Sequence, residues 1–284
     1  MKLGIFAKTF PRDSLEANLD ALVEHGLSCT QYNLQCAGLS TLPDTIADDL
    51  CARIRSAHSA RGLSMAAISG TFNIIDHDRD RLEANMARFE VLVHAAPKLG
   101  THVVTLCTGS CDMEEMWRRH PDNDSDQAWQ DMLASMRRIV AVAEAAGIDV
   151  AIEPEVNNIV SSAKKARLLL DAIPSSRLKV IFDAANLFHG GNIAHMQHVL
   201  DEALDLLGRD IVIAHAKDIS PDGHSHQPAG TGLLDYRYFL AGLRRCGFDG
   251  PLIVHGLDEH QVPGCLQFLR KEMAALAEQP PQSD

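Results

Sequence analysis

Residues 127–155, QAWQDMLASMRRIVAVAEAAGIDVAIEPE, contain one helix–strand unit that indicates the class of fold. From residue 127 to 146, apolar side chains recur at helical spacing, namely Met132, Leu133, Met136, Ile139, Val140 and Ala143. Gly147 follows this stretch, where a helix commonly ends on a glycine. The apolar run 150–152 comes next and stops at Glu153. We therefore expect an amphipathic helix that leads into a buried strand with a carboxylate at its end.

The same unit is repeated along the chain, which contains eight short apolar runs separated by helical patterns. The runs are residues 3–7, 29–34, 65–68, 103–107, 150–152, 180–182, 211–214 and 252–254. Most of them are apolar throughout rather than alternating, which indicates strands buried on both faces of a parallel sheet. An open doubly wound sheet would have a glycine-rich turn after its first strand, but this chain has AKTFPRDS at residues 7–14. The pattern predicts a single (β/α)8 TIM barrel of the α/β class over residues 1–277, followed by a disordered tail at 278–284.

The composition excludes several classes of function. The chain has 284 residues, which suits one barrel of about 250 residues. Its 38 acidic and 26 basic side chains give a formal net charge of −12, which disfavours a nucleic-acid partner. No apolar stretch approaches the about 18–20 residues needed to cross a bilayer, and the N-terminus lacks the pattern of a secretory signal. Seven cysteines without paired spacing indicate reduced thiols. We therefore expect a cytoplasmic protein with no membrane partner.

Polar side chains follow the last four apolar runs, at the end of a barrel where active sites lie. They are Glu153, Asp183, His215 and His255. Taken singly, a carboxylate at such a position is commonly a helix N-cap, and a histidine is commonly a hydrogen-bonded core residue. Together, four oxygen and imidazole donors at one depth favour a site for one divalent metal ion, which is Mn²⁺, Mg²⁺, Co²⁺ or Zn²⁺.

Several segments resemble the xylose-isomerase-like barrel superfamily, and the likeness covers nearly the whole chain. They are AIEPE at 151–155, IFDAAN at 181–186, AHAKD at 214–218, AGTG at 229–232 and PLIVHG at 251–256. The superfamily includes sugar isomerases and epimerases, inosose dehydratases and the AP endonuclease IV group. The chain looks closest to the sugar phosphate isomerase/epimerase branch, through SGTFN at 69–73, TLCTGS at 105–110 and MWRRHPDN at 116–123.

The resemblance also implies a set of metal ligands. In this family a glutamate, an aspartate, a histidine and a second glutamate hold a metal after strands five to eight. Glu153, Asp183 and His215 match the first three, and His255 stands at the fourth position, where it can still ligate through a ring nitrogen. A second departure is Asn186, where the family often has a histidine. Family epimerases use both glutamates as bases, one on each face of the substrate, so His255 breaks this symmetry.

The resemblance implies a small-molecule sugar substrate and proton transfer through an enediolate, with Glu153 as a base or a ligand. Isomerisation requires one base, whereas epimerisation usually requires two, so the sequence favours an isomerase over an epimerase. Glu155, Glu259 or His189 could supply a second proton carrier. The alternatives are a dehydratase of a keto-cyclitol or sugar acid and an inactive sugar-binding barrel. An AP endonuclease is disfavoured by the two departures and by the acidic net charge.

Lys217 is expected to act in the reaction. It follows His215 by two residues, so it should share the face of that ligand and bind a substrate oxygen or steady an enolate. The alternative is a salt bridge between Lys217 and either Asp218 or Glu259.

Loops at the barrel mouth supply the expected substrate-binding residues, which are Asn73, Trp117, Arg118, His120, Glu155 and Asn186. The Trp-Arg-Arg-His cluster could close over a substrate, with Arg118 binding a carboxylate or phosphate. The alternative is a loop helix that packs Trp117 on the barrel. His224 and His226 are expected to be surface residues. The sequence leaves a homo-oligomer open.

Overall fold

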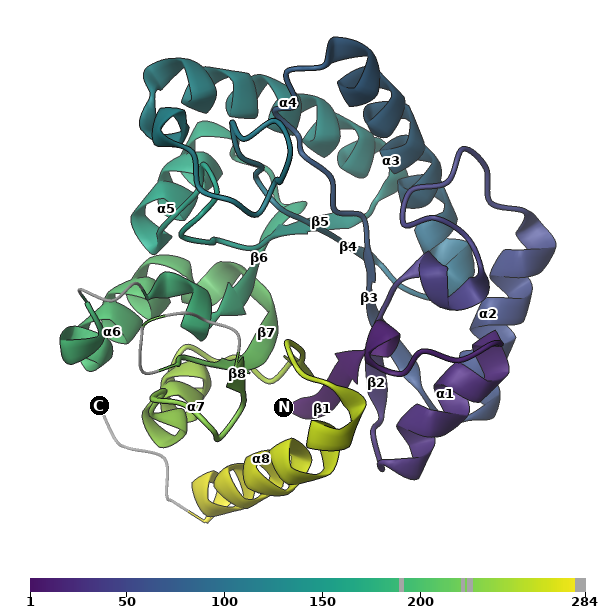
Figure 1. The fold of residues 1–284 in the computed structure, drawn as a ribbon, viewed down its shortest axis with the longest axis vertical. Helices are drawn as coiled ribbons and strands as arrows, with labels where there is room; N and C mark the ends of the chain where they lie inside the picture. Colours follow the sequence, from purple (N-terminus) through teal and green to yellow (C-terminus); the bar gives the residue numbers. More distant parts are fainter. Residues whose placement is uncertain (189–191, 221–222, 224–226, 279–284) are drawn as a thin grey trace.

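Eight parallel strands form a closed ring in the computed structural model, which describes residues 1–188, 192–220, 223 and 227–278 (Figure 1). The strands are β1 (Lys2–Phe6), β2 (Cys29–Tyr32), β3 (Ser64–Ser69), β4 (Val103–Leu106), β5 (Asp149–Ile152), β6 (Leu178–Asp183), β7 (Ile211–Asp218) and β9 (Pro251–Val254). They are hydrogen-bonded in the order β6-β5-β4-β3-β2-β1-β9-β7, and a further pairing of β6 with β7 closes the ring. The predicted (β/α)8 TIM barrel is confirmed.

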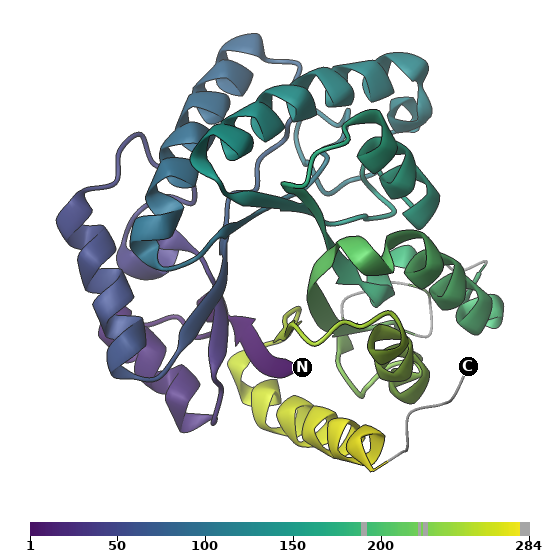
Figure 2. The ribbon, with the colours of Figure 1, turned by 180° about the vertical axis from the view of Figure 1, so that it is seen from behind.

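Eight α-helices form an outer ring around the strands, as the two opposite views show (Figures 1 and 2). They are α1 (Leu15–Glu24), α2 (Asp48–Ala60), α3 (Arg79–Leu99), α4 (Asp126–Ala146), α5 (Ala163–Ala172), α6 (Met196–Leu207), α7 (Tyr236–Arg245) and α8 (Val262–Ala277). The backbone N–H of Ala128 donates to the Ser125 hydroxyl at 3.2 Å and so caps the start of α4. Gly147 ends the same helix with a φ of 68°, in the left-handed region that favours glycine. The helix predicted over residues 127–146 is therefore confirmed.

Short elements connect the strands and helices at both ends of the barrel. They are the 3-10 helices η1 (Ala7–Thr9), η2 (Leu34–Ala37), η3 (Pro121–Asp124), η4 (Ala184–Leu187), η5 (Ile193–His195), η6 (Gly208–Asp210) and η7 (Glu259–Gln261), and the two-residue strand β8 (Gln227–Pro228). Strand β8 pairs antiparallel with the end of β7, where Lys217 is opposite Pro228. This pairing holds residues 227–228 against the end of β7.

Along the barrel axis, the interior changes from apolar to polar between one level of side chains and the next. A separate apolar cluster fills one level of the interior with Cys29, Ala67, Ala151, Ile181, Ile213 and Ile253, which come from six different strands. Side chains two residues apart on a strand share a face. The next inward level therefore contains Gln31, Ser69, Glu153, Asp183, His215 and His255. The apolar level forms a floor beneath this polar level.

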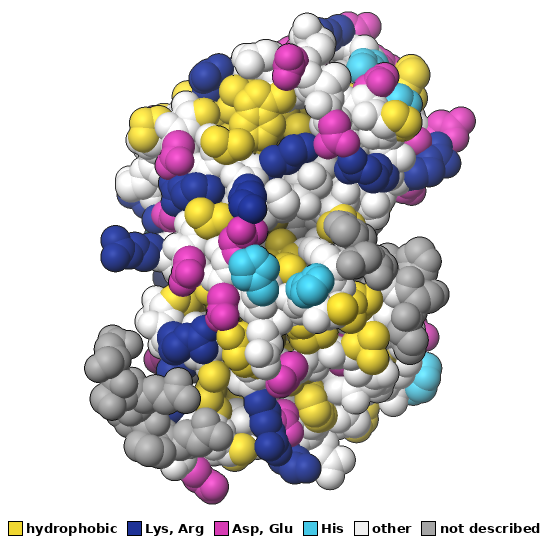
Figure 3. Space-filling view, turned by 90° about the vertical axis from the view of Figure 1, so that its left-hand side faces the viewer, with side chains coloured by type: hydrophobic (Ala, Val, Ile, Leu, Met, Phe, Trp, Pro, Cys, Tyr) yellow, Lys and Arg dark blue, Asp and Glu magenta, His cyan; other side chains and the backbone are white. Residues whose placement is uncertain are grey.

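The surface carries both signs of charge. On the face shown in Figure 3, basic and acidic side chains are interleaved rather than gathered into a field of one sign. Many of them are paired, as Arg138 is with Glu83 at 2.6 Å between α4 and α3. All seven cysteines have free thiols. Among the described residues, no helix is both long enough and apolar enough to cross a membrane.

Some predicted features fall at or beyond the limits of the described residues. The tail predicted to be disordered begins at Glu278, whose backbone N–H still donates to the carbonyl of Ala274 at 3.3 Å at the end of α8. Residues 279–284 lie outside the described residues, and so do His189, His224 and His226. Their predicted roles stay predictions.

We expect the substitution Gly4→Ala to destabilise the barrel, because β1 leaves no room for a side chain at this position. A Cβ atom there would lie 2.6 Å from Cδ1 of Ile253 and 2.7 Å from the carbonyl oxygen of Cys29. Overpacking of this kind costs about 1–3 kcal/mol. The matched control is Gly264→Ala in α8, where a Cβ would meet nothing within 4 Å. Urea unfolding should show a loss of stability for Gly4→Ala alone, and equal midpoints for the two variants would contradict this packing.

Candidate metal centre

Four predicted ligands meet in the polar level of the barrel. Glu153 directly follows β5, Asp183 ends β6, His215 lies in β7 and His255 directly follows β9. One ligand atom from each lies within 4.8 Å of the others. Nδ1 of His215 is 3.4 Å from Oε1 of Glu153 and 3.7 Å from Oδ2 of Asp183, and Nε2 of His255 is 2.9 Å from the same Asp183 oxygen. The strand ends therefore bring together the residues that the sequence predicts.

The four side chains fit one divalent cation. Carboxylate oxygens and imidazole nitrogens are ligands of Zn²⁺, Mn²⁺ and Co²⁺. Bonds of about 2.0–2.2 Å from one ion place neighbouring ligand atoms about 3–4 Å apart, which is close to the separations observed here. Asp183 and His215 are buried, while Glu153 and His255 are partly exposed toward the mouth. The cluster resembles the divalent metal sites of this class of barrel.

The electrostatics of the cluster are set by burial and by the opposite charges within it. Burial alone would lower the pKa of His215, but Glu153 and Asp183 outweigh it and raise this pKa to about 9. Burial would raise the pKa of Asp183, but Lys217 and the two histidines outweigh it and hold the pKa well below its usual range. Burial and the positive charge of His215 lower the pKa of His255 to about 4. At neutral pH the proton on this ligand set therefore resides on His215.

Lys217 and Asn186 connect the two carboxylates. Nζ of Lys217 lies 3.2 Å from Oδ2 of Asp183 and donates to the side-chain oxygen of Asn186. The amide nitrogen of Asn186 in turn donates to Oε1 of Glu153 at 2.6 Å. Because an ammonium only donates and a carboxylate only accepts, this chain fixes the orientation of the Asn186 amide. Lys217 thus shares the face of His215, and its salt bridge is with Asp183.

The acidic residues considered as second proton carriers have different surroundings. Glu155 is buried and accepts the backbone N–H of Asn157 at 3.1 Å, and burial raises the pKa of its carboxyl group to about 7. Glu259 binds Arg12 through both carboxylate oxygens, at 2.6 and 2.8 Å. This ion pair ties the loop after β1 to the loop after β9. The carboxylate of Glu259 is therefore occupied by Arg12, whereas Glu155 lies two residues after the predicted ligand Glu153.

Two residues of the site were missed by sequence reasoning. Oε1 of Gln31 lies 3.0 Å from Nε2 of His215, on the side of the ring away from the carboxylates. The ring of Phe6 packs against His215 and His255, with centroid distances of 5.5 and 5.0 Å. Both residues lie inside apolar runs that predict strands. The sequence feature that could have identified Gln31 was its polar side chain within a run predicted to form a buried strand.

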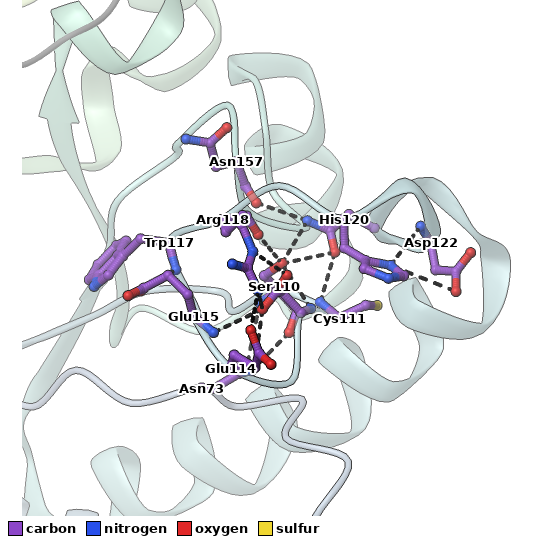
Figure 4. Close-up of polar contacts among 12 residues, drawn as sticks. Asn73, Ser110, Cys111, Glu114, Glu115, Trp117, Arg118, His120, Asp122 and Asn157 are labelled. Carbon is purple, nitrogen blue, oxygen red and sulfur yellow. Dashed lines mark hydrogen bonds and ion pairs between the residues drawn. The ribbon is translucent and has the colours of Figure 1, made fainter.

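The loop between β4 and η3 contains three of the six predicted substrate-binding residues, and its polar groups hold the loop itself (Figure 4). Ser110 Oγ donates to the carbonyl of Arg118 at 2.6 Å. The guanidinium of Arg118 donates to Asp112 at 2.6 and 2.8 Å and to Glu114 at 2.9 Å. Arg118 therefore already has two carboxylate partners within the loop, and its contact with a substrate anion stays a prediction.

The other predicted residues near this loop differ in their contacts. Asn73 and His120 form hydrogen bonds with the backbone, whereas the side chain of Trp117 is exposed. Asn73 donates to the carbonyl of Ser110 at 2.8 Å, and its side-chain oxygen accepts two backbone N–H groups. Nδ1 of His120 accepts the backbone N–H of Asp122 at 3.2 Å. Trp117 is 44% exposed and points away from the polar network in Figure 4. Residues 111–120 form no helix, so Trp117 does not sit on the loop helix considered as an alternative.

Comparisons with known proteins agree with this architecture. The family described as the xylose isomerase-like TIM barrel matches residues 19–276. A D-tagatose 3-epimerase-like protein has a TM-score of 0.77 and 15% identity, covering 98% of this chain and 99% of that one. The IOLI protein, solved with a zinc atom, has a TM-score of 0.72 and 17% identity over 97% and 98%. The 3-keto-D-glucoside 4-epimerase of E. coli has a TM-score of 0.72 and 19% identity over 98% and 100%. At these identities the structures show a shared fold.

Metal binding should weaken as the pH falls, beginning well above the range of an ordinary histidine. A cation ligates only neutral imidazole, so at pH 7 each bound ion must displace the proton of His215, whose pKa is about 9. The apparent affinity should therefore fall about tenfold for each pH unit below that pKa, whereas an unshifted histidine would begin this loss near about 6.5. Calorimetric titration with Mn²⁺ in buffers of different ionisation enthalpy measures the released proton. Binding at pH 7 without proton release would contradict this assignment.

Proposed function

This chain belongs to the xylose isomerase-like TIM barrel family, and we propose that it is a metal-dependent isomerase or epimerase that acts on a keto-sugar through an enediolate. The observation that carries the proposal is the convergence of Glu153, Asp183, His215 and His255 within 4.8 Å at the barrel mouth. Further support comes from structural neighbours that are named a D-tagatose 3-epimerase-like protein and a 3-keto-D-glucoside 4-epimerase.

The four converging side chains would hold the metal ion. When bound, a divalent cation supplies positive charge that stabilises the negative charge developing on substrate oxygens as the α-proton leaves. The floor of apolar residues beneath the site, with Ala151 and Ile253 directly below two ligands, keeps water away from the inner side. Phe6 covers the two imidazole rings from the side of β1. The mouth is therefore the open approach for a sugar.

Glu153 is the residue to which we assign proton transfer. Its carboxylate takes the α-proton, and the electrons of the C–H bond form the enediolate. The proton then returns from the same carboxyl group to the neighbouring carbon, while the hydroxyl proton moves from one substrate oxygen to the other. Asn186 holds Oε1 with a 2.6 Å hydrogen bond, so we assign the transfer to Oε2. Lys217, whose ammonium group lies 3.2 Å from Asp183, steadies the negative charge on a substrate oxygen.

The ligand set favours isomerisation over epimerisation. Return of the proton to the neighbouring carbon needs one base, and Glu153 supplies it. Return to the opposite face of the same carbon usually needs a second base, and the fourth ligand position holds His255 rather than a glutamate. The pKa of His255 is lowered to about 4, which makes this imidazole a weak proton acceptor. Two other acidic residues were considered as the second base. Glu155 is two residues from Glu153 along the chain, and Glu259 is paired with Arg12.

The loop after β4 is proposed as the wall that determines which substrate fits. The hydrogen bond of His120 within this loop, together with that of Asn73 from the loop after β3, holds the backbone that carries Trp117. Trp117 then offers an exposed apolar ring to the substrate, and Arg118 contributes charge at the rim. Glu155 and Asn186 complete the proposed binding residues on the side of β5 and β6.

The substitution Glu153→Gln should lower kcat by about 10²–10⁴, because the amide keeps the shape of the side chain but cannot accept the proton. Rates must be compared at saturating metal, since a neutral oxygen also ligates more weakly. Glu83→Gln on α3 is the matched control, because Glu83 pairs with Arg138 on the outside of the barrel. The assay follows a panel of keto-sugars by NMR in D₂O. An active Glu153→Gln variant with an unchanged rate would contradict this role.

The substitution His255→Glu should permit some epimerisation, because it restores the second carboxylate of the family pair. The expected result is a new epimer beside the isomer, detected by NMR of the products at saturating metal. A variant that binds metal and isomerises but forms no epimer would show that His255 does not limit the reaction type.

The same panel separates the alternative functions. Loss of water from the substrate, seen as an unsaturated or deoxy product, would identify a dehydratase. Binding of a sugar without turnover, by a protein that holds no metal, would identify a sugar-binding barrel and would refute the proposed function.

A further inference from the structure

Gln31 lies inside the barrel on the far side of His215 from the two carboxylates. It comes from β2, whose neighbours in the ring are β1 and β3, whereas His215 comes from β7. The two side chains therefore meet across the interior rather than along the sheet. Gln31 is 3% exposed and His215 is 1% exposed. Their contact, 3.0 Å from Oε1 of Gln31 to Nε2 of His215, is shielded from water.

The position of Gln31 decides which nitrogen of His215 faces the ligand set. Nδ1 lies 3.4 Å from Glu153 and 3.7 Å from Asp183, so Nδ1 is the atom available to a cation. Gln31 accepts a hydrogen bond from Nε2, which therefore carries the hydrogen when the ring is neutral. A flipped ring would turn a carbon toward Gln31 and lose this bond. The acceptor thus selects both the ring orientation and the tautomer.

A second contact directs the amide of Gln31 itself. Its nitrogen lies 3.4 Å from the hydroxyl of Thr105 on β4, and its oxygen faces His215. If the amide turned over, its NH₂ group would oppose the hydrogen on Nε2. Thr105 accepts from that nitrogen and so favours the orientation that presents the oxygen.

We infer that Gln31 is a positioning residue for the metal ligand His215, holding Nδ1 toward the ion through a hydrogen bond from Nε2. The inference rests on the metal site of the proposed function. In this role Gln31 acts on the ion through the imidazole of His215. Because an amide is neutral, it provides an acceptor without adding a third carboxylate beside Glu153 and Asp183.

The test compares Gln31→Met with wild type in the full chain. Methionine keeps the length and flexibility of the side chain but removes the strong acceptor. The matched control is Ser69→Ala, in the same level of the barrel, because the hydroxyl of Ser69 has no hydrogen-bond partner among the residues that the structure describes. Co²⁺ is titrated into metal-free protein and followed by its visible absorption. We expect Gln31→Met to bind Co²⁺ about 10–100-fold more weakly, with an altered spectrum, and Ser69→Ala to bind like wild type.

A second measurement needs no variant and reports on the imidazole directly. In ¹⁵N NMR spectra of the Zn²⁺-loaded wild type, His215 should carry the metal on Nδ1 and a slowly exchanging hydrogen on Nε2. Metal on Nε2 of His215 would overturn the inference even if Gln31→Met fails to fold.

The outcomes separate this inference from the proposed function. Wild type that binds no divalent cation would refute the metal site and, with it, the proposed function. Wild type that binds Co²⁺ while Gln31→Met binds it with equal affinity and spectrum would overturn the role of Gln31 alone. An equal loss of affinity in Ser69→Ala would show that the effect comes from packing in this level, and would also overturn it.

Discussion

The two-residue period of the strands is the constraint on which the rest of this structure depends. In a closed barrel every second side chain enters one shared interior, so a step of two residues moves a group from one level to the next. Ala151 and Ile253 belong to the apolar level. Glu153 and His255, two residues further along the same strands, reach the polar level. A register slip of one residue in either strand would turn its ligand toward the surrounding helices.

Charge in the polar level is balanced by neighbouring side chains rather than by solvent. Burying a carboxylate is costly unless it is paired and hydrogen-bonded. Asp183 is paired with Lys217 and contacts both histidines, while Glu153 accepts a hydrogen bond from Asn186. A divalent cation can replace the proton of His215 without leaving either carboxylate unpaired. The contacts that offset the cost of burying the carboxylates of Glu153 and Asp183 therefore also orient these two groups for an ion.

The sequence predicted the barrel and the convergence of Glu153, Asp183, His215 and His255 because both depend on local patterns that end at the same edge of the sheet. The contacts of Gln31 and Phe6 with His215 could not be predicted, since they join strands that are not neighbours and follow from the curvature of the closed ring. The loop after β4 was predicted to bind substrate, but the pairing of Arg118 with Asp112 depends on the path of an irregular segment that no periodicity encodes. The residues that end the strands can be predicted from the sequence, whereas the pairing of individual side-chain atoms across the interior cannot.

The position of His255 after the last strand has a consequence for assembly. Strand β9 lies between β1 and β7, so it closes the ring with the first strand of the chain. During synthesis, β9 leaves the ribosome after all the other barrel strands, and until it docks, β1 and β7 present unpaired edges. His255 therefore joins Glu153, Asp183 and His215 only when the ring closes. For this chain, the proposed ligand set is completed in the same step as the barrel.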